Sequence, residues 1–320
     1  MRKTTALIFA IAILGALTAC ASGANGASRS SARCNPVAAS GAASSVVTAT
    51  GAAGSAPKVD FPTPLYAKKT EVSTLRAGTG APIAAGQPVI LDVTILNGAN
   101  ATTLQKTSYG STGGSLITAG ESTFPALSEG LTCARVGSRI AIVGSALDSH
   151  KGMADPTNGI GKNDSFVYVV DVKNAFPAKA NGRSQIPVNG LPAVVLTDDG
   201  TPGITVPNRA APRSSTVTVL KEGAGATVKA GQFLVVKYTG IGWSTKTVFD
   251  STWPSSQATV LQAGASAVSP GLSKALIGRP VGSQILAVLP PKAAAVPDGT
   301  GKAPADDAAV YVVDILGIAG

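Results

Sequence analysis

The residues of this chain with the clearest potential for chemistry lie in the stretch VVKYTGIGWSTKTVFDSTW, residues 235–253. It contains a Tyr-Thr-Gly segment that begins at Tyr238 and a Phe-Asp-Ser segment that begins at Phe249. Two aromatic rings and the Asp250 carboxylate offer apolar walls and one polar contact. They provide neither a nucleophile paired with a general base nor a set of metal ligands. Chemistry at such a site must depend on an apolar environment and hydrogen bonding.

Other motifs are weaker candidates. His150 is the only histidine and lies among loop-forming residues, so a Ser-His-Asp triad would have to be built around a surface residue. The stretches GIGKN, from Gly159, and GTGKA, from Gly299, resemble a phosphate-binding loop. Neither lysine is followed by Ser or Thr, however, and the earlier glycine spacing is absent. We interpret both as turns and expect neither a cofactor nor a bound metal.

The elements that must position the candidate residues occur twice. LRAGTGAPIAAGQPVILDVT (Leu75–Thr94) and LKEGAGATVKAGQFLVVKYT (Leu220–Thr239) align at a constant offset of 145 residues. The match resumes at VGSRIAIV and VGSQILAV with the same offset, and at VYVVDV and VYVVDI after a small change in length. The chain therefore contains two copies of one unit.

Each copy has the pattern of several short β-branched strands, separated by Gly, Asn and Pro, and one short helix. In the second copy Ser269 can cap a helix that starts at Pro270, and Gly278 can end it. The same pattern recurs in the first copy from Pro125. We predict an α+β fold, with two tandem domains that each curve an antiparallel β-sheet around one short α-helix.

Residues 1–20 have the pattern of an export leader. Two cations and a short apolar run precede the ending LTAC, which resembles a bacterial lipobox. We expect cleavage before Cys20, lipidation of this cysteine, and anchoring at the extracytoplasmic face of the cell membrane. An ordinary signal peptide with an incidental cysteine is the alternative. Residues 21–42, rich in small polar residues, are expected to form a flexible tether.

After the leader only Cys34 and Cys133 remain. Two thiols without partner histidines are too few for a structural zinc site, and export makes disulfides possible. We predict a Cys34–Cys133 disulfide that ties the end of the tether to the helix region of the first copy. The alternative is two free, buried thiols.

The order of features in residues 215–320 resembles the FKBP-type peptidyl-prolyl cis-trans isomerases. These features are YTG on a strand, FDS after a turn, a V-x-P-G-L helix start, VGS, a strand that ends in Pro-Pro, and a final VYVVDI. The tandem arrangement behind a lipobox resembles the actinobacterial FKBP lipoproteins, which extends the resemblance to nearly the entire chain. It implies a degenerate FKBP-like domain at residues 43–178 and an isomerase domain at 190–320.

This resemblance implies a reaction without covalent change. Resonance gives amide rotation a barrier of about 18–20 kcal/mol, so X-Pro bonds interconvert over tens of seconds or longer. An apolar pocket with little water disfavours the planar, dipolar amide relative to the twisted one, and a few polar groups can favour the twisted form further. Such a catalyst needs aromatic walls and little acid–base equipment.

The resemblance assigns a role to each candidate residue. Tyr238 becomes a pocket wall whose hydroxyl meets the substrate carbonyl, Phe249 a second wall, and Asp250 the polar group near the twisting amide. Three more positions complete the pocket, two on its floor and one on the last strand: Val268, Leu272 and Tyr311. Taken singly, each is also consistent with a core residue or, for Asp250, with a turn cap bonded to nearby backbone.

The pocket also departs from the family pattern. Leu272 replaces a tryptophan, Ser269 an isoleucine, Thr259 a wall aromatic, and Ala295 a loop tyrosine. We expect a shallower and wetter pocket with weak catalysis, or binding without turnover.

The first copy lacks the candidate site. Subtracting 145 from Tyr238, Phe249, Asp250 and Ser251 gives positions without a hydroxyl, an aromatic ring or a carboxylate: Val93, Leu104, Gln105 and Lys106. We expect this copy to be catalytically silent and to serve as a spacer or docking surface. An earlier insertion in the alignment would instead bring Tyr109 and Phe124 into its pocket.

The function expected is a membrane-anchored, extracytoplasmic peptidyl-prolyl cis-trans isomerase that assists the folding of exported proteins. Its partners would be proline-containing exported polypeptides. Nucleic acid is excluded as a partner, because the net charge of +9 comes from scattered Lys and Arg without a basic run. The alternative is a non-catalytic peptide-binding chaperone or scaffold that uses the same grooves.

Overall fold

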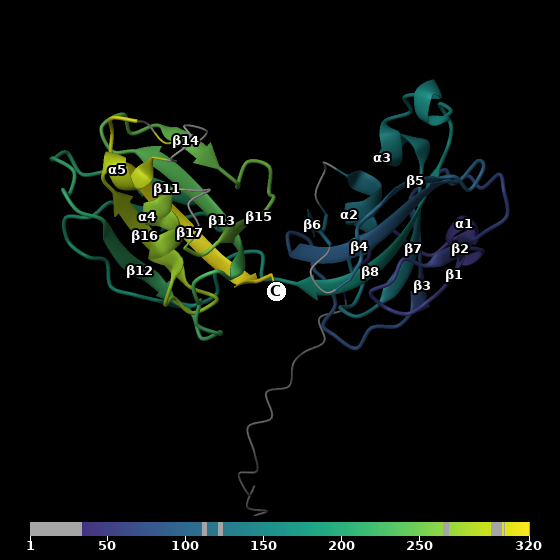
Figure 1. The fold of residues 1–320 in the computed structure, drawn as a ribbon, viewed down its shortest axis with the longest axis horizontal. Helices are drawn as coiled ribbons and strands as arrows, with labels where there is room; N and C mark the ends of the chain where they lie inside the picture. The colour runs from purple at the N-terminus through teal and green to yellow at the C-terminus, as the bar shows by residue number, and fades with distance from the viewer. Residues whose placement is uncertain are drawn as a thin grey trace, which may run out of the picture. The chain divides into compact units, whose positions relative to one another are not determined.

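In the computed structural model the described residues form two large β-sheets and two separate β-hairpins (Figure 1). The structure describes residues 34–110, 114–120, 124–264, 269–295, 303 and 305–319. Cys20 and Val268 lie outside these ranges. Within the described ranges, no helix is both long enough and apolar enough to cross a membrane.

The first sheet is formed by the strands of the first copy. They are β3 (Glu71–Arg76), β4 (Pro88–Asn97), β5 (Thr103–Lys106), β6 (Ser115–Thr118), β7 (Arg139–Gly144) and β8 (Phe166–Ala175). The order across the sheet is β3-β7-β8-β4-β5, with β6 also paired to β4, and these pairs are antiparallel. Helix α2 (Pro125–Leu131) covers one face, and α3 (Ala146–His150) and a 3₁₀ turn (Pro156–Asn158) lie between β7 and β8.

The second sheet repeats this topology. Its strands are β9 (Arg183–Ser184), β12 (Thr216–Glu222), β13 (Phe233–Gly242), β14 (Val248–Ser251), β15 (Thr259–Gln262), β16 (Gln284–Leu289) and β17 (Ala309–Ile318). The order is β14-β13-β17-β16-β12-β9, with β15 also paired to β13. Helices α4 (Pro270–Leu276) and α5 (Pro291–Ala294) cover one face. The equivalent strand order in both sheets confirms the predicted repeat and the α+β fold.

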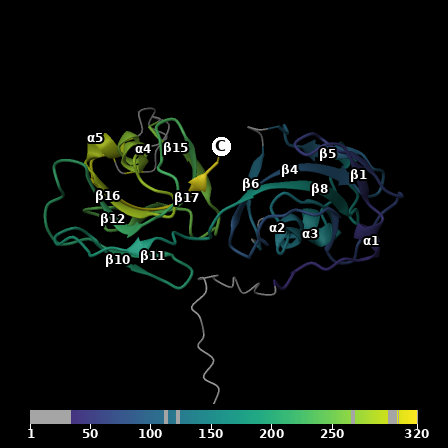
Figure 2. The same ribbon diagram turned by 90° about the horizontal axis from the view of Figure 1, so that it is seen from below.

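A hairpin from the preceding chain covers the other face of each sheet. Helix α1 (Ala42–Ser45) and the hairpin β1 (Thr48–Thr50) and β2 (Lys58–Asp60) precede the first sheet, and β10 (Ala193–Leu196) and β11 (Pro202–Thr205) precede the second. In Figure 2 the β10–β11 hairpin lies on the side of its sheet opposite α4 and α5. Because both faces are covered, strands such as β7 and β16 are buried along their whole length and are nearly continuous apolar runs.

The predicted helix in the second copy is confirmed. The Ser269 hydroxyl accepts a hydrogen bond from the Leu272 N–H at 3.3 Å, Pro270 is the first helical residue, and Gly278 has φ of +80° just beyond the end. Ser269 also donates to the Ala293 carbonyl at 2.7 Å, which links α4 to α5.

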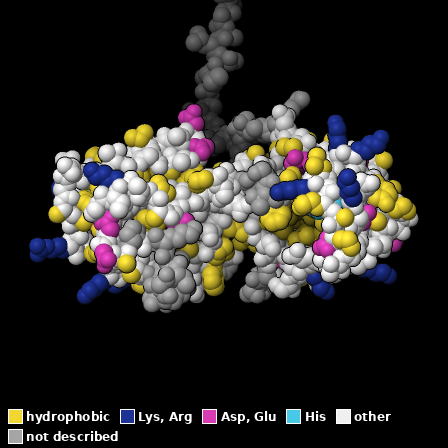
Figure 3. Space-filling view, turned by 90° about the horizontal axis from the view of Figure 1, so that it is seen from above, with side chains coloured by type: hydrophobic (Ala, Val, Ile, Leu, Met, Phe, Trp, Pro, Cys, Tyr) yellow, Lys and Arg dark blue, Asp and Glu magenta, His cyan; other side chains and the backbone are white. Residues whose placement is uncertain are grey.

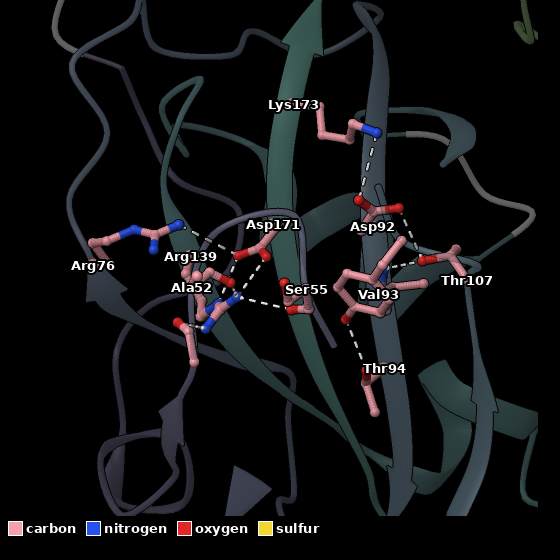
Figure 4. A network of polar contacts seen from close by, with 12 residues as sticks. Ala52, Ser55, Arg76, Asp92, Val93, Thr94, Thr107, Arg139, Asp171 and Lys173 are labelled. Atoms are coloured by element: carbon pink, nitrogen blue, oxygen red, sulfur yellow. Dashed lines mark hydrogen bonds and ion pairs between the residues drawn. The ribbon is translucent and has the colours of Figure 1, made fainter. Parts of the chain in front are cut away.

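A buried ion pair fixes the first hairpin to its sheet (Figure 4). The Arg139 guanidinium donates to both oxygens of Asp171 at 2.6 Å. The same guanidinium donates to the backbone carbonyls of Gly51 and Ala52, in the turn between β1 and β2, at 2.9 and 3.0 Å. Since Arg139 is only 2% exposed, removing Asp171 would leave its guanidinium buried without a charged partner. Asp171 also has the Arg76 guanidinium at 3.7 Å.

Cys34 and Cys133 form a disulfide across 99 residues of chain. Cys133 directly follows the C-cap of α2, so the bond joins the start of the described chain to the helix region of the first domain, as expected from the sequence.

On the face shown in Figure 3, the Lys and Arg side chains are dispersed among neutral and acidic ones.

Candidate functional site

The candidate site lies where β13, β14 and β17 pair. Gly240 on β13 is the register partner of both Asp250 on β14 and Tyr311 on β17, and Tyr238 points to the same face because it is two residues away. The pairing of β13 with β14 shifts after Gly240, so that Phe249 has no partner of its own. This bulge bends β14 and allows Phe249 and Asp250 to contribute side chains to one site.

The structure brings Tyr238, Phe249, Asp250 and Tyr311 together. The Tyr238 hydroxyl donates to Asp250 Oδ2 at 2.5 Å. The Phe249 ring meets Tyr311 edge to face, with centroids 5.5 Å apart and an interplanar angle of 83°, and the Tyr238 and Tyr311 centroids are 6.3 Å apart. Aromatic pairs favour such geometries. All three rings pack on the hydrophobic cluster that contains α4.

One expected role differs from what the structure contains. From the resemblance we expected the Tyr238 hydroxyl to meet the substrate carbonyl, whereas here its single proton is donated to Asp250. The Tyr238 hydroxyl therefore orients the carboxylate in this structure.

Gly240 is a site residue to which the sequence analysis gave no role. A Cβ atom at this position would lie 2.6 Å from Phe249 Cζ and 3.0 Å from Tyr311 Cε1, so a side chain would displace the rings. A glycine inside a strand often indicates such a close approach. The third residue of the Tyr-Thr-Gly segment therefore carried a usable signal.

Burial keeps the two phenols of the site neutral. Burial raises the pKa of Tyr238, and the hydrogen bond to Asp250 and the charge of Asp250 raise it further. Burial is also the larger cause of the raised pKa of Tyr311, with a smaller contribution from Asp250. Both groups are hydrogen-bond donors over the physiological pH range.

Helix α4 contributes Leu272, which is 3% exposed and lies in the same core cluster as Tyr311. Val268, the other expected floor residue, lies outside the described residues. Among the departures from the family pattern, Ser269 fixes the start of α4, Thr259 begins β15, and Ala295 follows α5 and is partly buried.

The pairing register of the first sheet supports the constant offset of 145. Ile95 pairs with Gln105 and with Tyr168, as Gly240 pairs with Asp250 and Tyr311. Gln105 thus takes the place of Asp250, and a bulky Ile95 takes the place of Gly240. A depression of about 490 Å³ remains there, lined by Ile95, Leu104, Gln105 and Phe166 among others.

The alternative alignment of the first copy is wrong. The Tyr109 hydroxyl bonds to Thr94 Oγ1 at 2.7 Å, and Thr94 points to the opposite face of β4 from Val93. Phe124 precedes α2 and is 55% exposed. Neither ring fills the equivalent of the second-copy site.

Solved structures that the chain matches in part include a crystal structure of the three FKBP domains of wheat FKBP73. It has 17% sequence identity and a TM-score of 0.35, and the match covers 78% of this chain and 94% of that chain. A crystal structure of FkpA from Escherichia coli has 21% identity and a TM-score of 0.30, with 42% of this chain and 54% of that chain covered.

Comparison of the sequence with protein families identifies the second copy. Residues 225–316 match the family model of the FKBP-type peptidyl-prolyl cis-trans isomerases. A probable FK506-binding protein from Corynebacterium glutamicum is 28% identical over 115 residues, which are 36% of this chain and 96% of the relative. An FK506-binding protein from Streptomyces anulatus is 27% identical over 119 residues, or 37% of this chain and 96% of the relative. Residues 225–316, most of the second copy, therefore form a domain of the FKBP-type peptidyl-prolyl cis-trans isomerase family.

Proposed function

We propose that the second domain catalyses cis-trans isomerisation of X-Pro bonds in exported polypeptides. The observation that carries this proposal is the convergence of three aromatic rings and one oriented carboxylate on one face of the sheet: Tyr238, Phe249, Tyr311 and Asp250. The rings provide apolar walls for a proline ring and exclude water from the amide. A planar amide has the larger dipole, so water exclusion raises its free energy relative to the twisted transition state.

Asp250 adds a fixed charge to this apolar site. Its carboxylate is held by the Tyr238 hydroxyl at 2.5 Å, so it does not need to reorganise as the amide twists. The two phenols remain neutral, since burial raises the pKa of both. The site therefore acts by shape and electrostatics, with no proton transfer.

A matched pair of substitutions tests the proposal. The rate of cis-trans exchange in a tetrapeptide with a central Leu-Pro bond is measured by NMR exchange spectroscopy, with the wild type, Asp250→Ala and Gln105→Ala. We expect acceleration by the wild type, a loss of about tenfold or more in Asp250→Ala, and no loss in Gln105→Ala, which changes the equivalent first-copy position. Peptide binding without acceleration by the wild type would favour the chaperone or scaffold alternative.

We further propose that the protein is anchored by a lipid at Cys20. The proposal rests on the LTAC sequence at the end of the apolar leader. In the Cys20→Ala variant, the protein should leave the washed membrane fraction. A variant that remains in that fraction to the same extent as the wild type would contradict lipid anchoring.

A further inference from the structure

We propose that the hydroxyl of Tyr311, and not that of Tyr238, donates the hydrogen bond that holds a carbonyl oxygen of the bound peptide. This inference rests on the proposed function of the second domain as a site for proline-containing peptides. It gives Tyr311 a polar role in binding in addition to its role as an aromatic wall.

The Tyr238 hydroxyl already donates its proton to Asp250. A phenol has one proton to donate, and that of Tyr238 lies on Asp250 Oδ2 at 2.5 Å. Donation to a peptide carbonyl would break a bond to a charged acceptor, which is the stronger type of hydrogen bond. It would also leave Asp250 without the contact that orients it.

The hydroxyl of Tyr311 is free to donate. It makes no hydrogen bond with any residue in the described part of the chain. It is also absent from the fully enclosed polar atoms without a partner in the described part of the chain. The side chain as a whole is 5% exposed, so bulk water has little access to it.

The position of this hydroxyl is fixed by the packing of its ring. Tyr311 is in the middle of β17, between β13 and β16, where it pairs with Gly240 and Ala287. Its ring is held by the edge-to-face contact with Phe249 and lies beside Tyr238. A donor that is already oriented loses little conformational freedom when a peptide carbonyl accepts its proton.

The first domain has a tyrosine at the same place with a different environment. Tyr168 pairs with Ile95 as Tyr311 pairs with Gly240, and it is 6% exposed. Ser149 Oγ, from α3, and the Tyr168 ring both lie close to Gly144, and Ser149 Oγ makes no hydrogen bond within the described part of the chain.

The chemistry of the amide predicts which kinetic constant this bond affects. The carbonyl oxygen carries its largest negative charge when the amide is planar, because resonance is lost on twisting. A donor to that oxygen binds the planar ground state at least as well as the twisted transition state. Such an interaction improves affinity and does not lower the rotation barrier.

The test compares Tyr311→Phe with the wild type, using the full chain and a tetrapeptide with a central Leu-Pro bond. Peptide affinity is measured by NMR titration, and kcat and KM by exchange kinetics. We expect Kd and KM to rise about three- to tenfold, as for loss of one hydrogen bond, and kcat to stay within about twofold. Unchanged affinity in Tyr311→Phe would overturn the inference.

Two further measurements separate this inference from the proposed function. If the wild type binds the peptide without accelerating exchange, and Tyr311→Phe still weakens binding, the catalytic proposal fails and the inference stands. If the wild type does not bind the peptide, both fail. In wild-type protein labelled with ¹³C at tyrosine Cζ, peptide should shift the Tyr311 resonance and leave that of Tyr168 in place. The opposite pattern would overturn the inference without any substitution.

Discussion

At the scale of single residues, the position of Gly240 separates the two copies most clearly. A glycine there leaves space for the Phe249 and Tyr311 rings, and Ile95 occupies the equivalent position in the first sheet. Position 240 was not among the four positions compared between the copies: Tyr238, Phe249, Asp250 and Ser251 against Val93, Leu104, Gln105 and Lys106. A glycine inside a strand indicates that something approaches closely, but the rings that approach Gly240 are set by strand pairing, which the local sequence does not show.

Gly240→Ala tests this interpretation. The added methyl would lie 2.6 Å from Phe249 Cζ, so the ring must move. We expect kcat/KM to fall at least about tenfold and stability to fall by about 1–3 kcal/mol, as for overpacking of a core. Gly203→Ala in β11 is the control, because its nearest contact would be at 3.5 Å. Equal activity of Gly240→Ala and wild type would contradict the proposed packing of the site.

A pH profile tests the electrostatics of the phenols. The pKa values of Tyr238 and Tyr311 are both raised, mainly by burial, so the neutral forms persist beyond the ordinary value of 10.0. Isomerase activity should therefore stay constant from pH 7 to about 10, although an ordinary phenol begins to ionise in this range. A decline in this range that occurs in the wild type and disappears in Tyr238→Phe would show that the pKa of Tyr238 is not raised.

At the scale of elements, the sequence predicted the helix well and the strands in outline. Ser269, Pro270 and Gly278 specify the limits of α4 through local backbone geometry, which sequence shows directly. The bulge at Phe249 depends on the pairing of β13 with β14, and pairing is a long-range property. Sequence periodicity could not predict the Tyr238–Asp250 bond or the covering of each sheet by a hairpin. Both depend on contacts between residues that are far apart in the chain.

Ser269→Ala should destabilise the second domain. The change removes the cap of α4 and the hydrogen bond to the Ala293 carbonyl, which links α4 to α5. We expect the free energy of unfolding to fall by about 1–2 kcal/mol, the usual effect of losing an N-cap. Urea unfolding followed by tryptophan fluorescence measures this free energy. Ser215→Ala is the control, because the Ser215 side chain is exposed. A variant that matches this control would mean that the cap contributes nothing.

At the scale of the whole molecule, repetition was the feature that sequence revealed most fully. The constant offset of 145 residues predicted two equivalent sheets, and it also predicted the register that puts Gln105 at the place of Asp250. The same fold thus occurs twice, once with the candidate site and once without it. Membrane anchoring at Cys20, export and the identity of the clients remain predictions.

Loss of the disulfide should affect the two domains differently. The Cys34–Cys133 bond closes 99 residues within the first copy, while Trp243 and Trp253, the two tryptophans of the chain, lie in the second. Cys34→Ser with Cys133→Ser should lower the stability of the first domain by about 2–4 kcal/mol. Far-UV circular dichroism should therefore detect earlier unfolding, and tryptophan fluorescence should not. A parallel shift of both signals would contradict independent stabilisation of the first domain.

The most direct test of the central claim is the rate of proline exchange in a protein that has lost the hydroxyl and the carboxylate of the second-copy site. NMR exchange spectroscopy of the Leu-Pro tetrapeptide compares the wild type with the Tyr238→Ala, Asp250→Ala double variant, whose fold is checked by its amide spectrum. We predict that the wild type accelerates exchange and that the folded double variant leaves it near the uncatalysed rate, on the scale of tens of seconds. Equal acceleration by both proteins would contradict the assignment of isomerase activity to this site.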